Sequence, residues 1–284
     1  MGRTNHALGW CTRTQGLKSL VMSNTSNLRH SLKIQFRVVG ALLMREVITR
    51  YGRHNIGFLW LFIEPMMLTL GITALWTLSG ASHGSSLPIA AFALTGYSSV
   101  LLWRSVTNRC CNAIKPNLSL MYHRHVKIID IFTSRILLEL AGTTASFISL
   151  GIIFTATNLI KPPEDILIIM LAWFLLAWFG AALGLLIGTL SERSETIEKI
   201  WHPVSYLLFP LSGAAFMVDW LPTATQKLIL LLPMVHGVEL LRQGYFGSTV
   251  HAHYDIAYMS AINLGITLLA LSQERHISRL VVPE

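Results

Sequence analysis

Charged side chains inside long apolar stretches are the residues of this sequence whose positions most suggest a function. Glu64 lies in the stretch 58–78, directly before Pro65, and Arg135 and Glu139 lie in the stretch 131–159. A charge at the centre of a membrane span costs about 2.5–3.5 kcal/mol, so it usually has a partner or faces a wet cavity. The four-residue spacing predicts that Arg135 pairs with Glu139. Glu64 is either a capped carboxylate at a kink or a gating residue that faces a cavity.

Arginines and aromatic residues form a second group near the ends of these stretches. Guanidinium groups bind carboxylate and phosphate bidentately, and an aromatic ring can stack on the apolar face of a sugar. Each ring alone is explained by the belt of Trp and Tyr at membrane interfaces. Together they indicate a possible binding surface, whose main members are Arg45, Arg50, Arg53, Arg104, Trp60, Tyr97 and Trp103.

Sequence motifs for catalysis and metal binding are not found in this sequence. It contains no G-x-x-x-x-G-K-[ST], no G-x-S-x-G and no H-E-x-x-H. The pairs His123/His125 and His251/His253 have no carboxylate or thiolate at a suitable spacing, so we interpret them as loop histidines. The three cysteines include no C-x-x-C pair. We therefore predict no enzyme, no metal site and no cofactor on this chain.

The composition predicts an all-α polytopic membrane protein. Hydrophobic residues make up 52% of the chain and charged residues 13%, against about 25% charged in soluble domains. A span needs about 20 apolar residues. We predict six spans, at 58–78, 87–106, 131–159, 166–190, 203–218 and 256–271. Pro222 and Pro233 break the segment 219–246, which predicts a re-entrant or interfacial helix pair before the last span.

The distribution of Lys and Arg predicts the orientation in the membrane. Only Lys161, Lys227 and Arg242, of 22 Lys and Arg residues, fall on the side opposite the termini. By the positive-inside rule, both termini are then cytoplasmic. This asymmetry also explains the net charge of +8 without a nucleic-acid partner.

Two further patterns concern helix packing. In the stretch 34–51, Ala41, Met44 and Ile48 share one helical face and Glu46 lies opposite, which predicts an amphipathic helix in the cytoplasmic interface. A packed cytoplasmic helix is the alternative. Glycines at 180, 184 and 188 form a stripe that lets a neighbouring helix approach closely. The predicted organisation is a tail or misassigned start at 1–29, an interface helix at 30–57, a six-span domain at 58–272 and a cytoplasmic tail at 273–284.

Two segments carry a family resemblance. Residues 41–66, ALLMREVITRYGRHNIGFLWLFIEPM, resemble the region around the first span of type-2 ABC transporter permeases, and more narrowly of group 2 capsular polysaccharide exporters. The most specific patterns in this segment are R-E-x-x-x-R-Y at 45–51 and G-x-L-W-x-x-x-x-P at 57–65. Residues 231–247, LLPMVHGVELLRQGYFG, are similar to the family's segment before the last span.

The resemblance implies an inner-membrane homodimer that exports a lipid-linked acidic polysaccharide. A separate ATPase subunit would bind ATP and Mg²⁺, and periplasmic co-polymerase and outer-membrane export proteins would continue the path. The channel residues are then expected to be Arg45, Arg50, Arg53, Trp60, Glu64, Tyr97, Trp103 and Arg104. The connections 109–130 and 191–199 would couple to the ATPase, with candidate residues Lys115, Tyr122, Arg124, Glu192, Arg193 and Glu195.

Two alternatives to this function remain open from the sequence. The same fold can serve a permease for another cargo, such as O-antigen, teichoic acid or a drug. An intramembrane glycosyltransferase or acyltransferase is a different class of protein. It needs acid, base or nucleophilic residues clustered at one depth, and the sequence does not assemble such a set.

Overall fold

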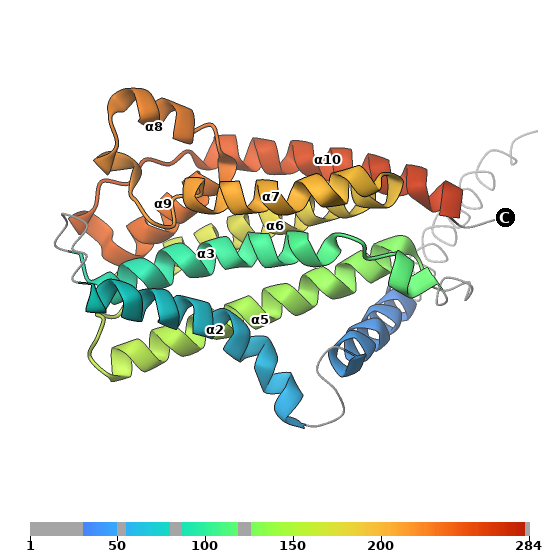
Figure 1. Ribbon diagram of the computed structural model, residues 1–284, viewed down its shortest axis with the longest axis horizontal. Coiled ribbons are helices and arrows are strands. Elements are labelled where there is room, and N and C mark those ends of the chain that lie inside the picture. The colour runs from blue at the N-terminus through green and yellow to red at the C-terminus, as the bar shows by residue number, and fades with distance from the viewer. Residues whose placement is uncertain (1–30, 50–54, 80–86, 119–125, 282–284) are drawn as a thin grey trace, which may run out of the picture.

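The computed structural model describes residues 31–49, 55–79, 87–118 and 126–281. Within these ranges all regular elements are helices and no strand occurs. The described residues form six long helices: α2 (Asn55–Leu78), α3 (Ile89–Cys110), α5 (Ile128–Ala156), α6 (Ile166–Arg193), α7 (Glu195–Leu211) and α10 (Ile256–Val281). Figure 1 shows α3, α5, α6, α7 and α10 running roughly along the longest axis of the molecule, with α2 oblique to them.

The six predicted spans fall on these six helices, with shifts at their ends. Four of them, α3, α5, α6 and residues 256–279 of α10, are long and apolar enough to cross a membrane. The fifth stretch was predicted at 203–218, but α7 covers 195–211, because Gly213 adopts a φ of +83° that ends the helix. Helix α10 continues to Val281, through most of the predicted tail.

Close packing between α3 and α6 forms the centre of the bundle. The glycine stripe of α6 lies against α3: a methyl group at Gly180 would come 2.8 Å from the Cα of Trp103. Trp103 is fully buried there, and its ring meets Phe179 edge to face at 5.9 Å. The partner of the predicted stripe is therefore α3. Asp165 starts α6 by accepting hydrogen bonds from the backbone N–H groups of Leu167 and Ile168.

A bent helix pair connects α7 to α10, as the sequence predicts. Helices α8 (Thr223–Ile229) and α9 (Pro233–Phe246) meet at 108°. Figure 1 places the end of α7 and the start of α10 at the same end of the bundle, so the chain between them returns to the end that it left. This path fits a re-entrant or interfacial pair, the two alternatives that the sequence predicts.

Arg242 of α9 holds this end of the bundle together. Its side chain is fully buried and donates hydrogen bonds to the backbone oxygens of Gly213, Ala214 and Phe216, just after α7. Its guanidinium carbon lies 3.8 Å from the ring centroid of Phe92 on α3. Backbone carbonyl groups of the irregular chain that follows α7 are thus satisfied by a side chain in place of water.

Residues 31–49 form a helix beside the opposite end of the bundle, drawn in blue in Figure 1. The side chains of Phe36, Met44 and Ile48 are exposed, at 77%, 63% and 51%. The other face carries hydrogen bonds to the bundle: Gln35 donates to Asp130 and Arg45 donates to Asn117. The same face also carries partly buried apolar side chains, among them Leu42, which packs against the core, so the helix combines features of the interface helix and of the packed helix that the sequence leaves open.

Candidate functional site

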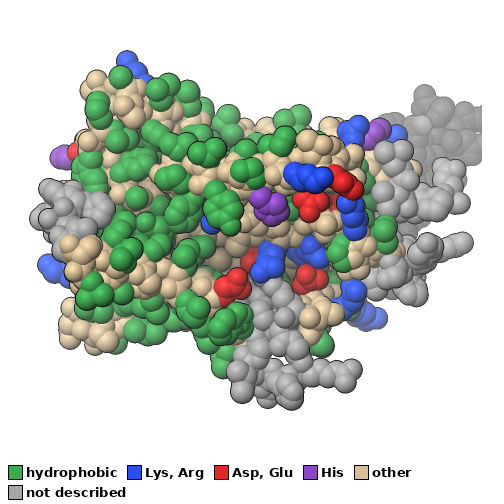
Figure 2. All heavy atoms as spheres, in the orientation of Figure 1, with side chains coloured by type: hydrophobic (Ala, Val, Ile, Leu, Met, Phe, Trp, Pro, Cys, Tyr) green, Lys and Arg blue, Asp and Glu red, His purple; other side chains and the backbone are tan. Residues whose placement is uncertain are grey.

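A polar pocket of about 480 Å³ opens between α2, α3, α5 and α7. Figure 2 shows charged and histidine side chains gathered in one part of a largely hydrophobic face. The residues around the pocket are Glu64, Pro65, Leu68, Leu101, Arg104, Ser105, Asn108, Arg109, Glu139, Gly142, Thr143 and His202. Both Glu64 and Arg104, which the sequence singles out as channel residues, line it.

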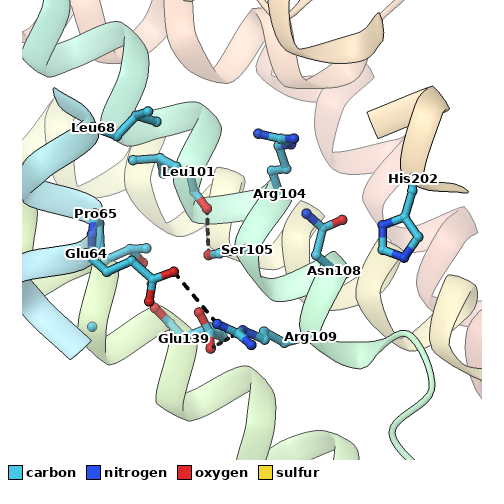
Figure 3. Close-up of a pocket in the computed structure, with 12 residues that line it drawn as sticks. Glu64, Pro65, Leu68, Leu101, Arg104, Ser105, Asn108, Arg109, Glu139 and His202 are labelled. Atoms are coloured by element: carbon cyan, nitrogen blue, oxygen red, sulfur yellow. Dashed lines mark hydrogen bonds and ion pairs between the residues drawn. The ribbon is translucent and has the colours of Figure 1, made fainter. Parts of the chain in front are cut away.

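Arg109 joins three helices at the floor of this pocket (Figure 3). Its Nε lies 3.4 Å from Oε1 of Glu139 on α5, and its Nη2 lies 3.9 Å from Oε1 of Glu64 on α2. The Glu139 side chain is only 8% exposed, whereas those of Arg109 and Glu64 are 44% and 55% exposed. The buried carboxylate is therefore the member of this group that most needs a cation.

The predicted pair Arg135–Glu139 is wrong. Instead, Nε of Arg135 lies 3.3 Å from Oε1 of Glu46 on helix 31–49, and its Nη1 donates a 2.8 Å hydrogen bond to the backbone oxygen of Arg109. The reason lies in helix packing, because two neighbouring helices bring charged groups to α5. Arg109 of α3 pairs with Glu139, and Glu46 of helix 31–49 pairs with Arg135.

Arg104 lies beside this ion-pair group and is held by aromatic rings. Its guanidinium carbon is 4.4 Å from the ring centroid of Tyr206 and 5.4 Å from that of Phe209, both on α7. Such cation–π contacts hold the guanidinium plane without neutralising its charge. Among the residues that the structure describes, no carboxylate lies within ion-pair distance of Arg104.

Asn108, one turn after Arg104 on α3, presents a hydrogen-bond donor in the same pocket. Its side-chain oxygen accepts a 2.8 Å hydrogen bond from Nε1 of Trp201, which leaves the amide NH₂ as the donor end. His202 follows Trp201 on α7 and lines the same pocket (Figure 3). An un-neutralised guanidinium, an amide donor and an imidazole suit a carboxylate or phosphate group.

The remaining predicted channel residues lie elsewhere. Trp60 on α2 is 49% exposed, and Arg45 donates to Asn117 outside the pocket. Tyr97 and Trp103 are buried, at 6% and 0% exposure, so neither ring is accessible for stacking on a sugar in this structure. The reason is the close approach of α6, which covers Trp103. Arg50 and Arg53 lie outside the described residues.

The predicted coupling residues gather at the end of the bundle near helix 31–49. Glu192 accepts a 2.9 Å hydrogen bond from the backbone N–H of Ile114, which joins the last turn of α6 to the chain after α3. Arg193 donates to Gln273 on α10, and Glu195 lies 3.9 Å from Lys199. Lys115 is exposed in the η1 turn (Lys115–Asn117). Tyr122 and Arg124 lie outside the described residues.

Sequence reasoning missed Asn108, Arg109 and His202 as pocket residues. A signal for the first two was present: Leu101, Arg104/Ser105 and Asn108/Arg109 recur at three- and four-residue steps, which places them on one face of a helix. Arg109 was assigned to the connection 109–130, but α3 extends to Cys110. No three His, Cys, Asp or Glu residues of the described chain lie together as metal ligands.

Helices long and apolar enough to cross a membrane, packed around a pocket with charged side chains, are typical of a polytopic membrane protein. Comparison with known families gives the particular one: residues 37–246 match the model of the ABC-2 type transporter family. The chain belongs to this family.

Relatives of known role match along almost their whole length. The chain is 42% identical to the capsule polysaccharide export inner-membrane protein BexB of Haemophilus influenzae, over 91% of this chain and 98% of that protein. It is 43% identical to CtrC of Neisseria meningitidis serogroup B, a protein with the same description, over 89% and 96%. Identity to the polysialic acid transport protein KpsM of Escherichia coli is 29%, over 87% and 96%.

Proposed function

We propose that this chain is the transmembrane subunit of an exporter that moves a capsular polysaccharide across the bacterial inner membrane. The observation that carries the proposal is the match of about 42% identity to capsule export inner-membrane proteins, which spans nearly the full length of both chains. The proposed cargo is an acidic polysaccharide on a lipid anchor. A pocket in which no carboxylate of the described residues neutralises Arg104 supports an anionic cargo.

In this proposal α2, α3, α5, α6, α7 and α10 are the six spans, and both termini are cytoplasmic. Helix 31–49 lies in the cytoplasmic interface with Phe36 and Met44 toward lipid. ATP is hydrolysed on a separate subunit, since the sequence has no phosphate-binding loop of its own. That subunit docks on the end that carries Lys115, Arg193 and Glu195. Two copies of the chain enclose the path, and periplasmic and outer-membrane proteins continue it.

The pocket residues have distinct roles in this function. Arg104 offers its guanidinium to a carboxylate or phosphate of the cargo, while Tyr206 and Phe209 hold the guanidinium plane in place. Asn108 donates a second hydrogen bond from its amide group. No carboxylate of the described chain neutralises Arg104. An anionic group of the cargo therefore does not have to displace a competing carboxylate before it binds the guanidinium.

The proposal is tested by complementing a deletion strain and measuring polysaccharide at the cell surface at equal permease levels. A hydrogen bond to a charged group contributes about 1.5–3 kcal/mol, so Arg104→Ala is expected to reduce export about tenfold or more. Arg104→Lys keeps the charge and is expected to retain part of it. Lys161→Ala removes an exposed cation at the other end of the bundle and serves as the matched control.

The deletion strain itself tests whether this chain is needed for capsule export. Without the chain, polysaccharide should accumulate inside the cell, and a tagged wild-type copy should co-purify with a P-loop ATPase in equal amount. Normal surface polysaccharide in the deletion strain would refute capsule export. Normal export by Arg104→Ala would remove only the pocket from the mechanism.

A further inference from the structure

The outward face of α10 changes from apolar to basic along its length. Helix α10 lies along one edge of the bundle (Figure 1) and packs mainly on α6. Met259, Ala270 and Ile277 mark its buried side. The exposed residues of the opposite side recur at three- and four-residue steps, so they share one face, here called the α10 stripe: Leu264, Leu268, Leu271, Ser272, Arg275 and Arg279. All of these but Leu264, together with His276, line one surface pocket.

The basic half of the stripe is not neutralised by the described residues. Arg275 and Arg279 are exposed, and no Asp or Glu of the described chain lies within ion-pair distance of either guanidinium. Glu274 is the only acidic residue of 264–279, and it is half-buried toward the bundle side of α10, from where it attracts Arg275 without pairing with it. The stripe therefore offers two guanidinium groups, and the imidazole of His276, to an external anion.

The apolar half of the stripe lies at membrane depth. Residues 256–279 are long and apolar enough to cross a membrane, and Leu264 and Leu268 are 52% and 61% exposed. Arg275 follows Leu264 by 11 residues, which is about 16 Å along a helix. This length is close to half of a hydrocarbon core about 30 Å thick. With Arg275 at the level of the headgroups, both leucines lie beside the acyl chains of the same leaflet.

Charge and depth together decide what can occupy the stripe. Residues 1–30 carry four Lys and Arg and no Asp or Glu, so this segment would add repulsion. A second copy of the chain, packed stripe against stripe about a twofold axis, would bring like charges together. A soluble acidic protein could reach the two arginines but not Leu264 inside the bilayer. An anionic phospholipid carries both a phosphate and acyl chains, at the separation that the stripe requires.

We propose that the α10 stripe binds an anionic phospholipid of the leaflet in which α10 ends, which is the cytoplasmic leaflet in the orientation proposed above. Arg275 and Arg279 donate charge-assisted hydrogen bonds to the headgroup phosphate. One acyl chain lies along Leu268 and Leu264. All residues of this site come from α10, whereas the charged pocket is formed by α2, α3, α5 and α7. Lipid binding at the stripe is therefore independent of the cargo.

The proposal is tested on the purified full-length protein in a neutral detergent by native mass spectrometry. Dioleoyl phosphatidylglycerol and dioleoyl phosphatidylcholine are added at matched concentrations, and the wild type is expected to bind phosphatidylglycerol more tightly because only this lipid has a net negative charge. Arg275→Gln/Arg279→Gln should weaken binding of the first phosphatidylglycerol about thirtyfold, which corresponds to about 2 kcal/mol. The control is Lys161→Gln/Lys227→Gln, which removes the same charge from two exposed residues outside α10 and should bind like the wild type.

Two further comparisons separate a bound phospholipid from a free anion and from misfolding. Excess inorganic phosphate should not displace phosphatidylglycerol, since phosphate has no acyl chain to contact the leucines. Arg275→Lys/Arg279→Lys keeps both charges and should retain most of the binding. The melting temperature without lipid should be equal in the wild type and all variants, because both arginines are exposed. If Arg275→Gln/Arg279→Gln melts lower, Arg279→Gln alone replaces it, with an expected loss of about fivefold in affinity.

Several results would overturn the proposal. They are equal binding of the two lipids by the wild type, unchanged binding of phosphatidylglycerol by the glutamine variant, an equal loss in the lysine control, and displacement by inorganic phosphate. The same mass spectra report the oligomeric state. A change of oligomeric state in the glutamine variant without a change in lipid binding would assign the stripe to a contact between copies of the chain.

Discussion

Replacing Arg242 by alanine should destabilise the whole bundle, although the residue lies far along the molecule from the charged pocket. The change removes the donors to the backbone oxygens of Gly213, Ala214 and Phe216. It also removes the cation above the ring of Phe92, whose centroid is 3.8 Å away. These contacts connect α9 to the end of α7 and to α3, so their loss affects three elements at once.

The magnitude follows from the two buried carbonyl groups, those of Gly213 and Ala214, because the third is partly exposed. A buried acceptor without a donor costs about 1–3 kcal/mol, so even the low end gives about 2 kcal/mol for two. A chain of this size loses about 2–4 °C of melting temperature per kcal/mol, which predicts a decrease of about 4–8 °C or more. Arg242→Lys can still donate to some of the carbonyl groups and should fall between Arg242→Ala and the wild type.

The assay is the apparent melting temperature in detergent, followed by tryptophan fluorescence at one fixed scan rate. Arg193→Ala is the control, since its guanidinium is exposed and donates to Gln273 at the protein surface. Surface changes of this kind alter stability by about 0.5 kcal/mol or less. A melting temperature for Arg242→Ala equal to that of Arg193→Ala would refute the role given to the buried guanidinium.

The other predictions concern the contacts that fix α3 and α6, and the same melting assay checks each of them. Gly180→Ala should lower the free energy of unfolding by about 1–3 kcal/mol, because the added methyl group overpacks against α3. Gly265→Ala is the control and should not lower it, since no heavy atom lies within 4 Å of the added methyl group. Trp103→Ala should cost about 3–5 kcal/mol, and equal loss in the half-exposed Trp60→Ala would contradict the burial argument. Asp165→Ala removes the N-cap of α6 and should cost about 1 kcal/mol, and an unchanged melting temperature would show that the cap is dispensable.

The helices could be predicted from the sequence because hydropathy is a local property. Each of the six apolar stretches became a helix, and Pro222 and Pro233 marked the break before the last one. The ends were less predictable: nothing in the composition of 203–218 shows that Gly213 takes a positive φ and ends α7 early.

The pocket was only partly predictable, because its contacts form between helices. Spacing along one helix predicted that Arg135 pairs with Glu139, but α3 and helix 31–49 supply competing partners that no single-helix pattern contains. From the sequence, Trp103 is grouped with the aromatic residues near the ends of the spans. In the structure α6 covers it, because Gly180 lets α6 approach α3 closely. Glu64 and Arg104, two of the expected channel residues, both line the pocket, and Glu64 stood out in the sequence because it is a charge inside an apolar stretch.

The most direct test of the account is whether cargo passes through the pocket between α2, α3, α5 and α7. A photoreactive amino acid at Ser105, which lines the pocket, would be irradiated in cells that are exporting polysaccharide, with Ile152 on the exposed face of α5 as the control position. The account predicts cross-links to polysaccharide at Ser105 and none at Ile152. Cross-linking at Ile152 alone, or at neither position during active export, would contradict it.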